Sequence, residues 1–250
     1  MRTRESIRNT KTIFKRELAA YFESPVAYVF IIIFLLLLGF LTFNISGFFE
    51  SNTADLRVFF DWHPWVYLFL IPSVAMRLWA EDRRLGTIEL ILTLPVTVME
   101  AVLGKFLAAW FFIGICLALT LPILFTVAYL GGPDPGVAAC GYLGSFLLSG
   151  SFLSVGIMTS SMTKSQVISF ILSVVISLFL ILAGFPPVLD ALYGLAPLWL
   201  TNLVSQFSFL SHFYSMERGV IDLRDLVYFL SVMVFFLFVT GLIIQNRRTS

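Results

Sequence analysis

The chain has 250 residues, of which 59% are hydrophobic and only 12% are charged, and its mean hydropathy is +0.94. A soluble domain carries about 25% charged residues, and a chain of this length has too little interior to hide so much apolar surface. The composition therefore excludes an ordinary soluble domain and predicts an all-α chain that lies mostly in lipid. The formal net charge of +1 gives no indication of a nucleic-acid partner.

A basic amphipathic helix over residues 4–22 is the first predicted element. Its apolar residues recur at helical spacing and its basic residues occupy other faces, as in a helix that lies in the membrane interface. A merely solubilising basic tail is the alternative, and the aromatic residues of the apolar face argue against it. The candidate functional residues of this helix are Phe14, Arg16, Glu17 and Tyr21.

Six apolar stretches follow, and each has about the 20 residues that a transmembrane helix needs. Ser24 and Pro25 form a good cap and first turn for the first stretch, whereas Pro64 and Pro72 interrupt the second. The spans are predicted over about residues 25–43, 58–78, 104–130, 137–159, 167–189 and 226–244.

The orientation of these spans follows from the basic residues. If both termini are cytoplasmic, all but three of the 16 Lys and Arg residues fall in cytoplasmic segments, and the exceptions are Arg57, Arg218 and Arg224. Because cytoplasmic loops are enriched in Lys and Arg, both termini are predicted to be cytoplasmic. Residues 1–250 are expected to form one multi-pass membrane domain.

Small polar residues recur at four-residue spacing along the predicted fourth and fifth spans. Such residues let helices pack closely in lipid, which is favoured here over a role in lining a translocation path. Both interpretations stay open for Ser145, Ser149, Ser169, Ser173 and Ser177.

The cytoplasmic segment 80–96 is the main candidate site. It starts with a charged cluster, Gly86 permits a turn, Thr87 is suited to cap a short helix, and Pro95 ends that helix. Such a helix is able to press an apolar ridge into a groove of a soluble partner, although a lipid-facing connector fits the residues equally well. The candidate docking residues are Glu81, Asp82, Arg83, Arg84, Leu85, Gly86, Thr87, Ile88, Glu89, Leu92 and Pro95.

The external stretch 190–222 is too long for a turn and too apolar for a disordered linker. It is predicted to form short re-entrant helices in the outer leaflet, because unpaired loop backbone does not persist in lipid. An exit gate for a lipid-like substrate and an aromatic cap that seals a dimer are both possible roles.

The run from Glu81 to Leu90, closing on Pro95, resembles the E-(E/D)-(R/K)-x-x-G-T-x-E-x-L-L-x-x-P signature of ABC-2 type transporter permeases. The segment 15–25 is similar to the interfacial helix that leads into the first span of that family. The segment 207–226 is similar to the gliding-motility-type branch of these permeases. The chain departs from the family in the prolines of its second span, so the outer half of that span is expected to be broken or re-entrant.

The resemblance implies a membrane-spanning permease subunit whose coupling helix, within residues 80–96, docks on an ABC ATP-binding subunit. Two such subunits and a second permease chain would complete the complex, in a bacterial inner membrane. The expected cargo is a lipid-like, glycan or amphipathic substrate that is exported. The gliding branch implies the alternative of an assembly complex for surface machinery, with an accessory external-domain protein.

The chain itself is not expected to be an enzyme. It has no GxxxxGK[ST] phosphate-binding loop, so ATP and Mg are expected on the partner subunit, with no cofactor or metal on this chain. His63 and His212 are interpreted as interfacial histidines with local partners, and Cys116 and Cys140 as buried apolar fillers. The scarcity of charge inside the spans disfavours an ion-coupled transporter.

Overall fold

The computed structural model describes residues 2–48, 55–87, 96–132, 134–195 and 197–246, which are almost entirely helical and contain no strand. In chain order the elements are α1 (Arg2–Glu23), α2 (Pro25–Phe40), the π-helix η1 (Leu41–Ile45), α3 (Arg57–Phe60), α4 (His63–Ala75), α5 (Arg77–Leu85), α7 (Val98–Ala118), α8 (Leu121–Gly131), α9 (Pro135–Met162), α10 (Gln166–Leu182), α11 (Pro186–Leu195), α12 (Leu198–Gln206), α13 (Phe209–Glu217) and α14 (Leu223–Asn246).

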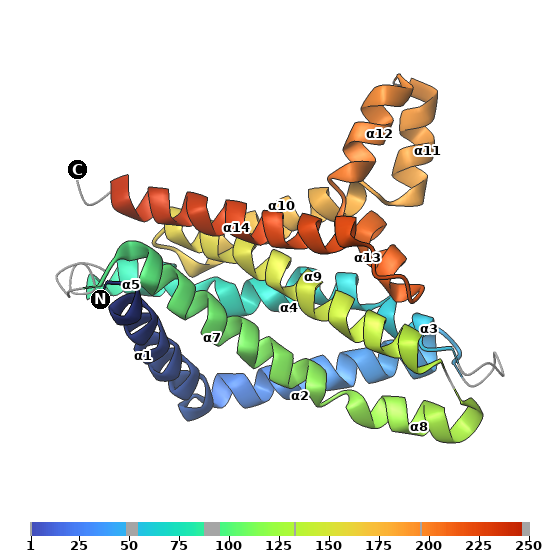
Figure 1. Ribbon diagram of the computed structural model, residues 1–250, viewed down its shortest axis with the longest axis horizontal. Coiled ribbons are helices and arrows are strands. Elements are labelled where there is room, and N and C mark those ends of the chain that lie inside the picture. The colour runs from blue at the N-terminus through green and yellow to red at the C-terminus, as the bar shows by residue number, and fades with distance from the viewer. Residues whose placement is uncertain (1, 49–54, 88–95, 133, 196, 247–250) are drawn as a thin grey trace.

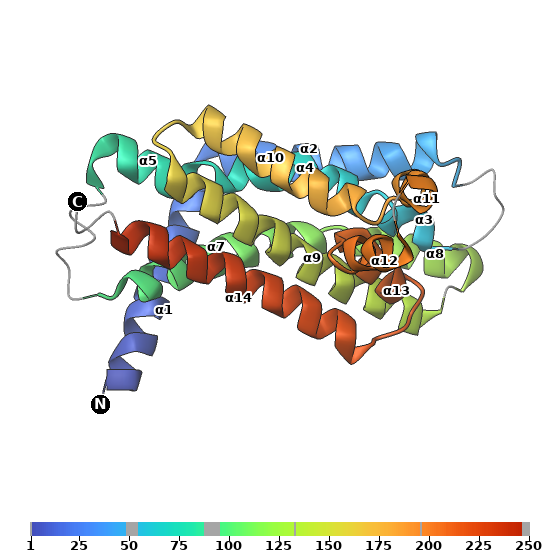
Figure 2. The ribbon, with the colours of Figure 1, turned by 90° about the horizontal axis from the view of Figure 1, so that it is seen from above.

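The long helices form an up-and-down bundle. Helices α2, α4, α7, α9, α10 and α14 run along its length, while α1 lies obliquely across one end (Figures 1 and 2). The start of α1 and the end of α14 lie at that same end. At the opposite end, α11 and α12 form a hairpin that projects from the bundle, and α13 packs beside α9 and α14.

Helix α9 is the centre of the bundle because its small residues let its neighbours approach closely. A Cβ atom on Gly156 would lie 2.4 Å from the Cβ atom of Ala75 in α4, and one on Gly150 would lie 2.8 Å from the sulfur of Met233 in α14. The predicted fourth span, 137–159, lies inside this helix. Its position explains why 83% of its most apolar stretch is buried, far more than in any other candidate span.

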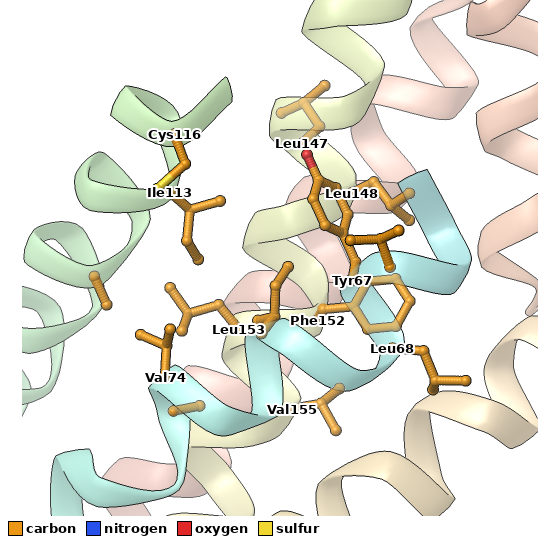
Figure 3. Close-up of a cluster of buried hydrophobic side chains, with 14 of the residues drawn as sticks. Tyr67, Leu68, Val74, Ile113, Cys116, Leu147, Leu148, Phe152, Leu153 and Val155 are labelled. Carbon is orange, nitrogen blue, oxygen red and sulfur yellow. The ribbon is translucent and has the colours of Figure 1, made fainter. Parts of the chain in front are cut away.

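The apolar core lies between α4, α7 and α9. Figure 3 shows side chains from these three helices gathered there, among them Val74, Ile113 and Leu153, which are all buried. Because lipid is as apolar as leucine, burial of these side chains inside the bundle gains little from the hydrophobic effect. Close van der Waals packing therefore has to stabilise the core.

Four described helices are long and apolar enough to cross a membrane, and their bounds are Pro25–Ile45, Val98–Tyr129, Pro135–Met162 and Leu223–Asn246. A fifth crossing results if α10 and the first part of α11, which are bent by 65° at their junction, act as one broken span. The chain therefore has the helices of a multi-pass membrane protein.

The predicted second span, 58–78, is not one long helix. Helix α3 ends at Phe60, α4 starts at His63 beside Pro64, and α5 starts after Met76. Proline has no N–H and fixes its own φ, so it favours a helix start at Pro64 and removes one internal hydrogen bond at Pro72. The expected interruption of this span is present, and its longest helix, α4, is shorter than the predicted span.

Two other predicted spans have different bounds in the structure. The third, 104–130, begins earlier, at Val98, because Thr97 and Glu100 form a reciprocal capping box. It is also interrupted at Leu119, before Pro122. The fifth, 167–189, stops at Leu182, since Pro186 starts the separate helix α11.

Candidate functional site

The candidate site lies at the end of the bundle where α1, α5, α7 and the end of α9 meet (Figures 1 and 2). The charged start of the predicted coupling segment 80–96 is not a loop but the second half of α5, which continues the chain after α4. Gly86 ends this helix with φ +73°, in the left-handed region that glycine adopts without strain. Four of the predicted docking residues, Ile88, Glu89, Leu92 and Pro95, lie outside the described residues.

A buried lysine joins three of these helices. The Nζ atom of Lys105, in α7, lies 2.8 Å from Oδ2 of Asp82 in α5 and 3.5 Å from Oε1 of Glu17 in α1. It also donates a hydrogen bond to the carbonyl oxygen of Leu78 at 3.0 Å and lies 5.1 Å from the ring centroid of Trp79. Its three N–H donors and its position over an indole ring account for a cation that is only 4% exposed. We call Glu17, Asp82 and Lys105 the junction.

Helix α1 is also held against α7 at positions that precede the junction in both helices. The side-chain amide of Asn9 donates a hydrogen bond to the carboxylate of Glu100, at 3.2 Å. One turn further, a Cβ atom on Gly104 would lie 2.7 Å from the Cγ2 atom of Ile13. Only glycine therefore permits this close crossing of α1 over α7.

Helix α5 is joined to the end of α9 by hydrogen bonds between side chains and backbone groups. The hydroxyl of Ser160 donates to the carbonyl oxygen of Met76 and accepts from the backbone N–H groups of Trp79 and Ala80, at 2.9 to 3.1 Å. The guanidinium of Arg83 donates to the carbonyl oxygen of Ser161 at 2.7 Å. These contacts satisfy N–H groups in the first turn of α5, which a helix leaves unpaired.

The predicted docking residues on α5 therefore divide into two groups. Asp82 and Arg83 are turned toward the bundle, and the hydroxyl of Thr87 donates to Asp82 at 2.9 Å. Arg84 and Leu85 are exposed at the end of the helix, with Leu85 at 63%. Glu81 is partly exposed and lies 3.9 Å from Arg77. Arg84 and Leu85 are therefore the exposed members of these described α5 residues.

The remaining candidate residues of α1 also contact α7 or each other. Phe14 meets Phe111 edge to face, with ring centroids 5.8 Å apart, and Tyr21 stacks on Phe112 at 4.9 Å. Burial raises the pKa of the Tyr21 phenol above its usual value. Arg16 pairs with its neighbour Glu17 at 2.8 Å. The aromatic face of α1 is therefore packed on the bundle.

The serines of α9 and α10 lie inside the bundle, away from the junction. Ser145, Ser149, Ser169, Ser173 and Ser177 are each at most 1% exposed. The hydroxyl of Ser149 donates to the carbonyl oxygen of Phe146. A Cβ atom on Gly156 would lie 3.3 Å from the hydroxyl oxygen of Ser173, so α10 approaches α9 closely at this point. A role of these residues in lining a path stays a prediction.

The histidines have local partners at the opposite end of the bundle. Nδ1 of His63 lies 3.1 Å from the carbonyl oxygen of Phe59, and His212 lies 2.6 Å from Asp225 and stacks on Tyr228. Both cysteines are free and buried. Within the described ranges, no group of three or more His, Cys, Asp or Glu residues is arranged to hold a metal ion.

Three residues of the site were not among the sequence candidates. Lys105 lies beside a charge-free stretch, and a lone lysine in that position is a signal for a buried ion pair. The pattern of Thr97 followed by Glu100 is a recognisable capping box, but it does not reveal that Glu100 also binds α1. Nothing in the sequence near Ser160 indicates its contact with α5.

No protein-family model matches the chain, and no curated protein matches it.

Proposed function

We propose that this chain is the membrane-spanning permease subunit of an ABC-2 type ATP-driven transporter. The junction is the observation that carries the proposal. The helix bearing the signature-like charged residues, α5, is bound through Lys105 to both the oblique helix α1 and the long helix α7. A push on the exposed end of α5 would therefore reach α1 and α7 together. The resemblance of residues 81–95 to the coupling helix of this family supports the same assignment.

In this proposal the chain crosses the membrane six times, with both termini in the cytoplasm of a bacterial cell. The crossings are α2, the broken segment α3–α5, α7–α8, α9, α10 and α14. The alternating direction of these helices along the bundle supports this topology, and so does the clustering of basic residues at the α1 end (Figures 1 and 2). Helix α1 then lies in the cytoplasmic interface, and α11–α13 lie outside.

Two copies of the chain, or this chain and a related one, would bind two ATP-binding subunits that supply ATP and Mg. Closure of the ATPases on nucleotide would displace the segment 80–96. Leu85, Ile88 and Leu92 would fill an apolar groove of each ATPase, while Arg84 and Glu89 would make polar contacts at its rim. The translocation path would form between the two permease chains. Spans with few charges suit the export of a lipid-like, glycan or amphipathic substrate better than that of an ion.

The test is copurification with a candidate ABC ATP-binding subunit produced together with this chain, followed by measurement of ATP turnover. The double variant Arg84→Ala/Glu89→Ala is expected to weaken assembly or lower permease-dependent ATP turnover at least about tenfold, which corresponds to about 1.4 kcal/mol. The matched control is Lys164→Ala, an exposed cation at the same end of the bundle. Unchanged assembly and turnover in the double variant would remove the docking assignment.

A second candidate function is a membrane component of an ATPase-linked assembly complex for surface or gliding machinery. The observation that favours it is the α11–α12 hairpin, which projects from the bundle (Figure 1) and exposes Leu198, Trp199 and Phe207. Exposed aromatic and aliphatic side chains of this kind suit an accessory external-domain protein. Deleting residues 187–206 would abolish binding of such a protein without loss of ATPase association.

A further inference from the structure

A groove opens on the surface of the bundle beside the crossing of α1 and α7. Its volume is about 650 Å³, within the range of pockets that hold small molecules. Its walls are almost entirely apolar, and its polar side chains, Ser6, Thr10 and Lys11, all belong to α1. The apolar lining includes Ile7, Phe14, Leu103, Leu107, Trp110 and Phe146.

A row of basic residues follows one edge of this groove. Arg4, Arg8, Lys11 and Lys15 are separated by four, three and four residues, so they share one face of α1. All four are exposed, and Lys11 is also part of the groove wall. Among the described residues, no carboxylate is paired with any of the four. An apolar groove with unpaired cations at its rim suits a ligand that has a hydrocarbon chain and an anionic head group.

We propose that the groove binds one anionic phospholipid of the cytoplasmic leaflet. An acyl chain would lie against Leu103, Leu107 and Trp110, and the phosphate would lie near Arg8 and Lys11. Basic residues near the membrane are attracted to anionic lipid head groups. The exposed apolar face of α2, by contrast, has no basic residue along it. Charge therefore distinguishes this groove from ordinary lipid-facing surface.

The groove also links this lipid to the junction. Phe14 lines the groove three residues before Glu17, and Leu103 lines it two residues before Lys105. A bound lipid would therefore hold α1 in the position that the junction requires. The proposal rests on the membrane placement of α1, which is part of the proposed function. It does not depend on the ATP-binding partner.

Fluorescence quenching tests the site directly, because Trp110 lies in the groove wall. The whole protein is reconstituted in phosphatidylcholine bilayers that contain either brominated phosphatidylglycerol or brominated phosphatidylcholine at the same fraction. Trp110 quenching is obtained by subtracting the signal of Trp110→Phe. Stronger Trp110 quenching by the anionic lipid is expected, and equal quenching by the two lipids would overturn the proposal.

Two double variants separate the contribution of the lipid head group from that of the apolar groove. Arg8→Glu/Lys11→Glu should lower the preference for the anionic lipid at least about tenfold, while Lys164→Glu, the matched control, should not change it. Leu103→Phe/Leu107→Phe narrows the groove without changing its charge, and it should lower the quenching of Trp110 by both lipids. If this second pair leaves quenching unchanged, the lipid is held by the surface charge of α1 alone and the groove is not a site. If the wild-type chain does not associate with an ATP-binding subunit, the proposed function is contradicted, whereas the lipid-quenching result still holds.

Discussion

At the scale of single residues, the structure depends on a few charged groups that have been withdrawn from water. Lys105 is 4% exposed and has two carboxylate partners, and Glu217 is 4% exposed at the opposite end of the bundle. A buried ion stays charged only where partners replace its hydration. These two residues differ in that respect, so opposite responses to neutralisation are expected.

Replacement of Lys105 by Met should destabilise the protein, because Asp82 and Glu17 would then repel each other without a cation. Breaking a fully buried ion pair costs about 3–5 kcal/mol. A loss of about 2 kcal/mol is expected here, since both carboxylates keep some contact with solvent. The unfolding midpoint in detergent measures this loss, and the exposed Lys164→Met is the control. Adding Asp82→Asn to Lys105→Met should restore part of it, and no restoration would argue against the junction.

Neutralisation of Glu217 should stabilise the protein, whereas neutralisation of Lys105 should destabilise it. Burial, with a smaller contribution from the charge of Asp61, raises the pKa of the Glu217 carboxyl from 4.5 to about 8. The folded state therefore favours the protonated form, and this stability is present at low pH and lost as the pH rises from 4.5 to about 8. Between pH 5 and pH 8 the unfolding midpoint of the wild type should fall more than that of Glu217→Gln. The exposed Glu23→Gln should follow the wild type, and parallel curves for Glu217→Gln would contradict the assignment.

At the scale of helices, positions without side-chain atoms decide how closely two elements approach. Helix α1 crosses α7 where Gly104 faces Ile13, and α9 meets α4 where Gly156 faces Ala75. In lipid, such close contacts replace the hydrophobic effect as the force between helices. The orientation of α1, and with it the position of Glu17, depends on the first of these crossings.

Gly104→Ala should therefore loosen α1, although alanine favours helix more than glycine by about 1 kcal/mol. The added Cβ atom would meet Ile13 at 2.7 Å and the carbonyl oxygen of Thr10 at 3.2 Å, so α1 must move away. Hydrogen exchange of the α1 amides should become faster. Gly39→Ala is the matched control, because nothing lies within 4 Å of the added atom there. Equal exchange in both variants would show that the crossing tolerates a side chain.

At the scale of the whole molecule, charge and length determine how the bundle sits in a membrane. Lys164 lies in the turn between α9 and α10, at the α1 end, and Asp222 precedes α14 at the opposite end. If all six lengthwise segments cross the bilayer, these two residues face opposite sides. If the broken segment α3–α5 does not cross, the sides of the later turns are reversed relative to α1.

Cysteine labelling in sealed inverted membrane vesicles distinguishes these arrangements. In a background without Cys116 and Cys140, Lys164→Cys should react with a membrane-impermeant maleimide added outside such vesicles, where the cytoplasmic face is exposed. Asp222→Cys should react only after the vesicles are opened. Thr12→Cys, on the exposed surface of α1, should react in the same way, because the proposed topology places α1 on the cytoplasmic side. If Thr12→Cys and Lys164→Cys react on opposite sides, the six-span topology is wrong.

The sequence alone determined that this protein lies mostly in lipid, and it determined where most of its helices form. Periodicity and composition are local properties, so α1 and the turn at Gly86 were predictable within a few residues, whereas the third and fifth apolar stretches differ more from the helices that they form. Breaks next to Pro64 and Pro186 have local causes too. The first was expected, whereas the second was not, because a mostly apolar stretch outweighs one proline in a hydropathy average. The docking role of segment 80–96 stays a prediction, and the helical structure of its first half was not expected.

Only the tertiary structure decided which polar groups meet. Lys105 is separated from Glu17 by 88 positions and from Asp82 by 23, and an ion pair between distant residues leaves no periodic pattern in the chain. The central position of α9 likewise depends on the atoms that face its glycines, which belong to other helices. Local propensities formed the helices, whereas packing at the glycines and the charge of one buried lysine brought α1, α5 and α7 together.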